Sequence, residues 1–240
     1  MVISPEIAAP EITVPAPAPR VKMPIADRAA LKRQGETVRA RIAADPGIWR
    51  LPSVRAEVFA IGDFLSPSEC DHFIALIDAN ARPSDTFDHV YQAKFRTSWS
   101  GDVERSDPFV RMVERRLDDL LGIDPDFGET VQGQRYRPGE EFRGHHDWFY
   151  TSAKYWAHEA KHGGQRSWTA MAYLNDVEAG GSTDFPHLGV SIAPKRGALL
   201  IWNNARPDGL VNEDTLHAAK PVEAGAKYVI TKWYRTRIWG

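Results

Sequence analysis

The stretch Tyr136–Phe149, YRPGEEFRGHHDWF, places two histidines and an aspartate in a row directly after a glycine. In a β-strand successive side chains point to opposite faces, so His145 and Asp147 would share one face while His146 turns away. Such a strand would aim a His-x-Asp pair at one point in space. By itself the tripeptide favours a polar turn or surface histidines, and the rest of the chain has to decide between these interpretations.

Short β-prone runs separated by turn residues surround this stretch. They lie near residues 131–137, 142–148, 168–175, 182–185, 188–192, 197–202, 215–221 and 226–236. Three helices are expected upstream, because each region combines capping signals with apolar residues at helical spacing. They begin at Asp27, at Ser66 and at Ser106, and the last ends at Gly122. This order predicts an α+β, mainly β fold in which the helices pack on one side of a β-sandwich or jelly roll.

The N-terminal segment differs in composition from the rest of the 240-residue chain. Residues 1–24 carry six of the 17 prolines, including VPAPAP at 14–19, and proline at this density favours an extended chain without regular hydrogen bonds. We therefore expect an extended arm over residues 1–26 and one domain over 27–240, with its jelly-roll core at about 130–237. The arm is either without fixed structure or lies across a partner subunit in a homodimer.

Composition excludes several classes of function. The net charge of -2 gives no general attraction to nucleic acid or anionic membranes. No apolar run is long enough to span a bilayer, and the N-terminus lacks the order of a secretory signal. Cys70 is the single cysteine, so it forms no internal disulfide, and the composition suits the cytoplasm. A metal in this protein must therefore rely on histidine and carboxylate ligands.

A third ligand could come from another predicted strand, at His217 in the run TLHAA. Two imidazoles and one carboxylate on one face of a metal leave several positions open, which is how non-haem iron(II) holds both a cosubstrate and dioxygen. Lys227 follows ten residues later in an apolar-flanked run. A fixed cation beside such a centre would suit the far end of a dicarboxylate.

At these residues the sequence resembles the 2-oxoglutarate- and iron(II)-dependent oxygenases, specifically the catalytic domain of prolyl 4-hydroxylases. The resemblance covers roughly residues 60–236, and several ordered motifs are far more specific than one His-x-Asp pair. The matching residues are Tyr136, Gly139, His145 and Asp147; Tyr173-Leu174-Asn175; Gly180-Gly181-Ser182-Thr183-Asp184-Phe185; His217, Lys227 and Lys232-Trp233; and, upstream, FLSPSEC at 64–70 and FRTSWSG at 95–101.

The resemblance implies a double-stranded β-helix and a dioxygenase that hydroxylates an unactivated C–H bond, most simply a peptidyl proline, with succinate and CO2 as coproducts. Its cofactor would be Fe(II), its cosubstrates 2-oxoglutarate and O2, and ascorbate would serve as a reductant. The residues implied are the metal ligands His145, Asp147 and His217; the 2-oxoglutarate contacts Lys227, Tyr136, Thr183, Tyr173 and Trp233; and the substrate contacts Arg166, Phe142 and Arg96. The stretch 84–100 occupies the place of a substrate-covering loop.

One departure from the family pattern keeps the substrate open. Three residues before the first metal ligand many relatives have tyrosine, whereas this chain has Phe142, which lacks a hydroxyl for a peptide substrate. An oxygenase of a free amino acid or another small metabolite is therefore an alternative. From a different class, a non-catalytic module that keeps the jelly roll, loaded with zinc or serving recognition alone, is the other alternative.

Overall fold

The structure is a computed structural model that describes residues 25–84 and 95–240. Nearly all of the arm predicted over residues 1–26 lies outside these residues, as does most of the loop predicted over 84–100. Both of these remain predictions. Within the described residues, no helix combines the length and the apolar character that a membrane span requires.

The helices and strands follow the expected order along the chain. The helices are α1 (Ile25–Ala43), α2 (Pro67–Asn80), α3 (Pro108–Leu121) and α4 (Trp156–Glu159), with 3-10 turns η1 (Pro125–Phe127), η2 (Pro186–Leu188) and η3 (Glu213–Thr215). The strands are β1 (Trp49–Arg50), β2 (Val58–Ile61), β3 (Arg82–Pro83), β4 (Trp99–Asp102), β5 (Gln132–Tyr136), β6 (Phe142–His145), β7 (Arg166–Tyr173), β8 (Ala179–Gly180), β9 (Thr183–Phe185), β10 (Val190–Ile192), β11 (Leu199–Asn203), β12 (His217–Ala219), β13 (Val222–Ala224) and β14 (Lys227–Arg235).

The three predicted helices are confirmed, and their ends show why. At the start of α2 the hydroxyl of Ser66 accepts from the backbone N–H of Glu69, while the Glu69 carboxylate accepts from the backbone N–H of Ser66. This reciprocal pair satisfies two of the amide groups that a helix start leaves open. At the end of α3, Gly122 adopts the left-handed conformation that terminates a helix (φ 64°).

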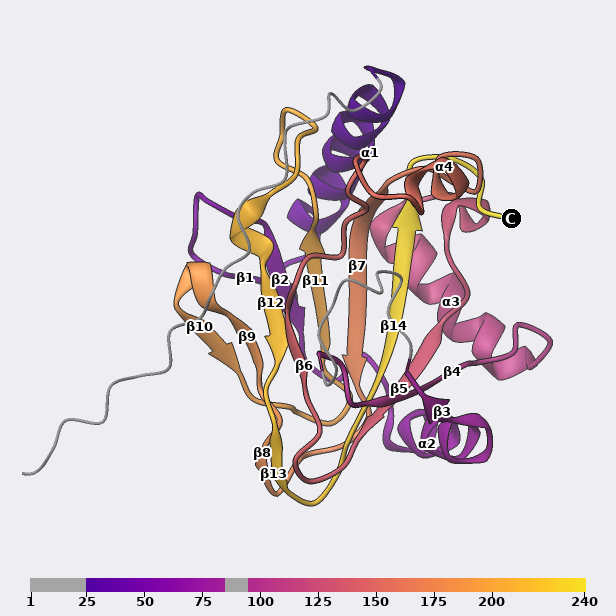
Figure 1. Ribbon diagram of the computed structural model, residues 1–240, viewed down its shortest axis with the longest axis vertical. Helices are drawn as coiled ribbons and strands as arrows, with labels where there is room; N and C mark the ends of the chain where they lie inside the picture. The colour runs from indigo at the N-terminus through magenta and orange to yellow at the C-terminus, as the bar shows by residue number, and fades with distance from the viewer. Residues whose placement is uncertain (1–24, 85–94) are drawn as a thin grey trace, which may run out of the picture.

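Two sheets form the body of the protein. The described residues build an eight-stranded sheet in the order β1-β2-β11-β7-β14-β5-β4-β3, a four-stranded sheet in the order β10-β9-β12-β6, and the pair β13-β8. In Figure 1 helices α2 and α3 lie on one side of this assembly, and β9, β10 and β12 lie on the other. The predicted mainly β architecture with helices on one side is confirmed. Strands β1 to β4 were not predicted, because strands of two to four residues are defined by their partners more than by their own composition.

The large sheet separates two hydrophobic cores, and strand alternation decides which residues enter each. Along β14, Ile230 and Tyr234 pack with helices α1 to α3 in the first core. Val229 packs with residues of the small sheet in the second core. The odd-numbered positions of β14, which begin with Lys227, therefore point into the space between the two sheets.

Lys232 is a buried lysine on the helix side of β14, and it anchors α3. It is 1% exposed, and its ammonium lies 2.7 Å from Asp118 Oδ1 and 3.5 Å from Glu114 Oε1. The hydroxyl of Tyr234 donates to the same Asp118 oxygen (2.8 Å). We expect Lys232→Met to lower the free energy of unfolding by about 3–5 kcal/mol, because it leaves buried carboxylates without their cation. Urea denaturation measures this.

A matched control for that prediction is Arg115→Ala on the outer face of α3. Arg115 forms an i,i+4 ion pair with Asp119, and both side chains are more than two thirds exposed. The control should change stability by less than about 0.5 kcal/mol, because exposed ion pairs contribute little. If the two variants lost similar amounts, the interpretation of Lys232 as a structural anchor would be wrong.

Candidate metal and cosubstrate site

Three potential metal ligands converge between the two sheets. His217 on β12 is the direct cross-strand partner of His145 on β6, so the sheet register brings together two residues that are distant in the sequence. His145 Nε2 lies 3.8 Å from Asp147 Oδ1, and His217 Nε2 lies 3.6 Å from Asp147 Oδ2. One ligand atom from each residue lies within 4.8 Å of the other two. A single ion can therefore contact all three side chains.

Both imidazoles are held with Nε2 toward this point. The Nδ1 atom of His145 lies 2.8 Å from the carbonyl of Arg143, and that of His217 lies 3.0 Å from the carbonyl of Thr215. Since a carbonyl only accepts, Nδ1 carries a proton in each ring, which leaves Nε2 as the atom that can bind a metal. Burial lowers the pKa of His145 well below its ordinary value, which keeps the ring neutral. Both rings thus point Nε2, the atom that would bind a metal, toward Asp147.

Asp147 is fixed as a carboxylate by a chain of two hydrogen bonds. Its side chain is buried, and Oδ2 accepts from the hydroxyl of Thr169 (2.9 Å), which in turn accepts from the Asn204 amide (3.0 Å). Burial acts to raise the pKa of Asp147, but the surrounding groups, including the charged Arg166, outweigh it and lower that pKa below its ordinary value. The oxygen atoms therefore stay ionised and are oriented for an ion.

The Thr169 hydroxyl gives a prediction about this orientation. Thr169→Val keeps the side-chain shape but removes the bond to Asp147, so we expect the affinity for Fe(II) to fall by about 10–100-fold. A metal titration of the metal-free protein measures this, and Thr169→Ser, which restores a hydroxyl, should recover most of the affinity. Equal losses in both variants would show that packing, and not the hydroxyl, explains the effect.

His146 faces away from the triad, as predicted from strand alternation. Its Nδ1 lies 3.0 Å from the Tyr150 hydroxyl, and its Nε2 lies 3.2 Å from the carbonyl of Glu213. His187 contacts the same carbonyl. Among the described residues, the triad is the one group of side chains with metal-ligand spacing.

Lys227 is a buried cation on the floor of the same cavity. It is the cross-strand partner of Tyr136 and is 1% exposed. Its ammonium donates to the Thr183 hydroxyl (3.3 Å) and lies 5.4 Å and 5.5 Å from the ring centres of Tyr136 and Tyr173. Within residues 25–84 and 95–240 it has no carboxylate at ion-pair distance; Asp184 acts on it only from further away. Burial lowers the pKa of Lys227 to about 7.

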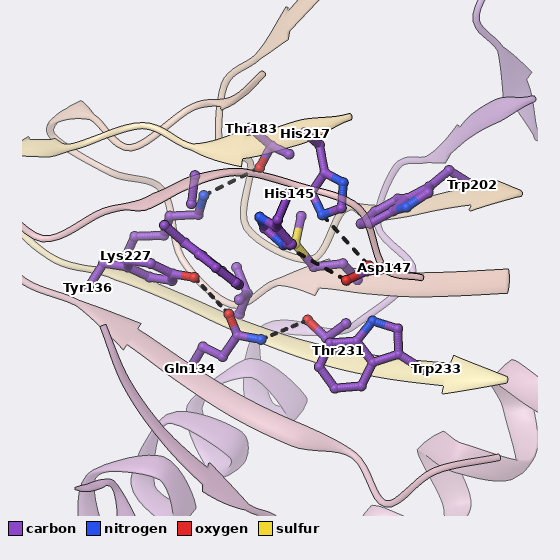
Figure 2. A pocket seen from close by; sticks show the side chains of 14 residues that line it. Gln134, Tyr136, His145, Asp147, Thr183, Trp202, His217, Lys227, Thr231 and Trp233 are labelled. Carbon is purple, nitrogen blue, oxygen red and sulfur yellow. Dashed lines mark hydrogen bonds and ion pairs between the residues drawn. The ribbon is translucent and has the colours of Figure 1, made fainter. Parts of the chain in front are cut away.

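Three other predicted cosubstrate contacts, Tyr136, Thr183 and Trp233, lie around Lys227 and the triad in Figure 2. The hydroxyl of Tyr173 donates to Thr183 (2.7 Å), and Trp233 lines the cavity beside Asp147. Burial raises the pKa of both Tyr136 and Tyr173, so both hydroxyls stay protonated and able to donate. Four of the five predicted contacts, Lys227, Tyr136, Thr183 and Trp233, thus line one cavity with the triad, and Tyr173 contacts Thr183 without lining the cavity itself.

Several residues of this cavity were not predicted from the sequence. The Tyr136 hydroxyl donates to Gln134 (2.7 Å), and the Gln134 amide donates to Thr231 (3.3 Å), as Figure 2 shows. Strand alternation could have found both, because Gln134 lies two residues from Tyr136 and Thr231 lies two from Trp233. Trp202, whose ring centre is 4.8 Å from that of His217, became apparent only from the register of β11 against β7.

A second, wider groove adjoins the triad, and we call it the outer groove. It is lined by His145, Asp147, Phe142, Trp148, Phe149, Tyr155, Trp233, Trp239, Arg82, Arg96 and Arg166, among others. All three predicted substrate contacts therefore lie in it. Arg166 is held by two hydrogen bonds to Glu129 (2.7 and 2.8 Å) and lies over the ring of Trp233 at 4.0 Å.

Phe142 and Arg96 form one stack against the metal-ligand cluster. The Phe142 ring is stacked on His145, with ring centres 3.6 Å apart and planes 14° apart. The Arg96 guanidinium lies 4.7 Å from the centre of the Phe142 ring and donates to Gln132 (3.0 Å). Phe142 therefore supports the position of His145.

The donor set fits iron(II) and 2-oxoglutarate. Two neutral imidazoles and one carboxylate would occupy one face of the ion and leave the remaining positions open. A buried ammonium with only a hydroxyl partner is costly, and a carboxylate from a ligand would complete it.

Comparisons with known proteins agree with this chemistry. A family model described as the 2OG-Fe(II) oxygenase superfamily matches residues 131–235. The probable prolyl 4-hydroxylase 8 of Arabidopsis thaliana is 32% identical over 201 residues, which cover 73% of this chain and 67% of the relative. Prolyl 4-hydroxylase 1 of the same plant is 31% identical over 222 residues, covering 80% and 76%.

Solved structures show the same fold. A viral collagen prolyl hydroxylase from Paramecium Bursaria Chlorella virus-1, in complex with 2OG, matches with a TM-score of 0.58 and 28% identity over 73% of this chain and 94% of the other. A prolyl-4-hydroxylase from Pseudomonas putida, with 19% identity and a TM-score of 0.55 over 85% and 99%, shares the fold. The double-stranded β-helix is confirmed, and the chain belongs to the prolyl 4-hydroxylase family of the 2-oxoglutarate- and iron(II)-dependent oxygenases.

Proposed function

We propose that this dioxygenase hydroxylates a proline in a peptide or protein, with iron(II) held by His145, Asp147 and His217. Lys227 would bind the far carboxylate of 2-oxoglutarate. The observation that carries the proposal is this lysine, a buried cation without a protein carboxylate that shares a cavity with three oriented metal ligands. When bound, iron(II) and 2-oxoglutarate supply the oxidation of a C–H bond by dioxygen, with release of succinate and CO2.

The residues of the chain would contribute orientation and exclusion of water. Lys227 and Thr183 would fix one end of the cosubstrate, beside Tyr136 and Tyr173, whose ring centres lie 5.4 Å and 5.5 Å from the ammonium. Trp202 and Trp233 line the cavity and would exclude water from it. Such fixed donors and a dry wall favour a single binding mode, which is what a selective oxidation needs.

The outer groove supports a peptide substrate over a small metabolite. It adjoins the triad, remains open to solvent and extends across several strands of the large sheet. A small metabolite is more commonly enclosed by its site. The names of the relatives, which are prolyl 4-hydroxylases, support the same choice.

The test is a turnover assay with Fe(II), 2-oxoglutarate and a peptide library, read by succinate formation and by mass spectrometry of the peptides. We expect one oxygen atom to be gained on proline in some library members. Turnover of free amino acids but of no peptide would favour the small-metabolite alternative. Bound zinc with no 2-oxoglutarate consumption after iron reconstitution would favour the non-catalytic module.

Three finer predictions stay proposals. Ascorbate as a reductant follows from the family resemblance alone. Cytoplasmic location is supported by the single cysteine, Cys70, which is buried and forms no disulfide. A homodimer would use the proline-rich arm, and analytical ultracentrifugation of the full chain tests it.

A further inference from the structure

A row of polar side chains on β5 connects the cavity of Lys227 and the triad with the outer groove. Tyr136, Gln134 and Gln132 are alternate residues of β5, so their side chains point to the same face of the sheet. Tyr136 and Gln134 line the cavity, whereas Gln132 lines the outer groove. On β14, the paired strand, Lys227 lies at the cavity floor and Trp233 lines both spaces. The cavity and the groove therefore share one wall.

Hydrogen bonds run along this wall. The Tyr136 hydroxyl donates to Gln134 Oε1 (2.7 Å), as Figure 2 shows. The other end of the same amide, Gln134 Nε2, donates to the Thr231 hydroxyl (3.3 Å) and to Gln132 Oε1 (3.4 Å). Gln132 Oε1 also accepts from the Arg96 guanidinium (3.0 Å). This oxygen thus accepts one bond from the cavity side and one from the groove.

In this arrangement the hydrogen of the Tyr136 hydroxyl is already used. A hydroxyl has one hydrogen to donate, and Gln134 accepts it. The contact between Tyr136 and 2-oxoglutarate that the sequence predicts needs the same hydrogen. If the hydroxyl turned to the cosubstrate, Gln134 Oε1 would lose its donor. Gln134 is only 6% exposed, and a buried acceptor without a donor is costly.

A reversal of the Gln134 amide, which exchanges its oxygen and its NH2 group, removes this conflict. The two groups are nearly the same size, so the exchange displaces no neighbour. After it, Nε2 donates to the oxygen of Tyr136, and the hydroxyl hydrogen can turn to the cosubstrate. Oε1 then accepts from the Thr231 hydroxyl, which among the described residues donates to no other group. The reversed amide is therefore fully hydrogen-bonded.

The reversal also affects Gln132. It moves Gln134 Oε1 to the place from which Nε2 donated, 3.4 Å from Gln132 Oε1. Two acceptors this close repel each other, so Gln132 reverses as well and donates through its own Nε2. Arg96 then loses Gln132 as an acceptor and keeps its bond to the Ser98 hydroxyl (3.0 Å). A change in the cavity thus reaches Arg96, which is a predicted substrate contact.

We infer that Gln134 is a positioning residue that couples cosubstrate binding in the cavity to the outer groove. Its amide has one orientation that holds the Tyr136 hydrogen and one that releases it, and cosubstrate binding favours the second. Gln132 passes the change to Arg96. Two sites that shift the same two-state element are coupled in this way. The inference rests on the proposed function, because it takes 2-oxoglutarate as the ligand of the cavity.

Isothermal titration calorimetry of 2-oxoglutarate into the Fe(II)-loaded full chain, without oxygen, tests the step from Tyr136 to Gln134. We expect Gln134→Met to raise the Kd for 2-oxoglutarate several-fold, because no amide then donates to the Tyr136 oxygen and holds its hydroxyl toward the cosubstrate. In the Tyr136→Phe background the same substitution should have no effect on this Kd. An unchanged or lower Kd in Gln134→Met, or an equal rise in both backgrounds, would overturn the inference.

NMR of the Gln132 side-chain amide tests the step from Gln134 to Gln132. The chain is loaded with Zn(II), which undergoes no redox chemistry. Gln132 Nε2 donates to no described residue, so its hydrogens exchange with water. Saturating 2-oxoglutarate should slow this exchange several-fold in the unaltered chain and leave it unchanged in Gln134→Met. Equal slowing in Gln134→Met would show that the effect passes through another residue, and would overturn the inference.

Tyr136→Phe keeps the test decisive if Gln134→Met does not fold, since it removes a single oxygen atom. Exchange at Gln132 that still slows with 2-oxoglutarate in Tyr136→Phe would also overturn the inference. Failure of the proposed function looks different. If 2-oxoglutarate binds the unaltered chain while Gln132 does not respond, the inference is wrong and the proposed function stands. If 2-oxoglutarate does not bind the Fe(II)-loaded chain at all, the proposed function itself has failed.

Discussion

Replacing His217 with alanine is expected to lower succinate formation by about 10³-fold or more while the protein stays folded. Mutating a residue that only orients a metal ligand already lowers metal affinity or activity by about 10–100-fold, and His217 is itself one of the three ligands. The loss should appear both in turnover and in Fe(II) affinity. Anaerobic addition of Fe(II) and 2-oxoglutarate, which should give a visible charge-transfer band with the unaltered chain, should give none with the variant.

A matched control is His187→Ala. His187 is an exposed histidine whose Nδ1 contacts the carbonyl of Glu213, and it lines neither the cavity nor the outer groove as described. This variant should keep nearly full activity. Retained succinate formation in His217→Ala, with circular dichroism showing a native fold, would eliminate His217 as a required ligand.

Lys227→Met should have opposite effects on cosubstrate binding and on stability. Removing the ammonium should raise the KM for 2-oxoglutarate by about 100-fold or more, because the far carboxylate would be buried without a partner. The same change should stabilise the cosubstrate-free protein by a few kcal/mol, on the order expected for removing a buried, poorly paired charge. Urea denaturation without metal or 2-oxoglutarate measures the second effect.

The pH dependence gives the sign of this stabilisation independently. Burial lowers the pKa of Lys227 to about 7 in the folded protein, below the ~10.4 of an unfolded lysine. The unfolded chain therefore binds more protons between these values, and the stability of the unaltered protein should rise with pH across that window. The gain in the free energy of unfolding from Lys227→Met should be full below pH 7 and should vanish near pH ~10.5. Binding of 2-oxoglutarate should weaken above pH 7, because the neutral amine must first take up a proton.

Lys232→Met is the matched control for this variant. Both lysines are 1% exposed and lie on β14, but Lys232 is paired with Asp118 whereas Lys227 has no ion pair among the described residues. The two substitutions should therefore shift stability in opposite directions. A loss of stability in Lys227→Met at pH 7 would contradict the assignment of Lys227 as a cation kept for a ligand.

Much of the site could be predicted from the sequence, because period-2 alternation and ordered motifs are local properties. The shared face of His145 and Asp147, the turn of His146 away from it, and the three capped helices all follow from neighbouring residues. The choice of His217 and Lys227 came from their place in a family pattern. The structure brings His145, Asp147, His217 and Lys227 into one cavity.

Other features depend on partners that are distant in the sequence. The chain by itself determined a mainly β domain, a His-x-Asp pair and an accompanying lysine. Only the tertiary structure decided that Lys227 faces the cavity while Lys232 faces α3, because the two lie in similarly apolar stretches and only the packing of the sheets gives each face its surroundings. The roles of Gln134, Thr169 and Trp202 were likewise decided by strand register and burial, since a hydrogen bond or a cavity wall exists only once separate strands have been paired.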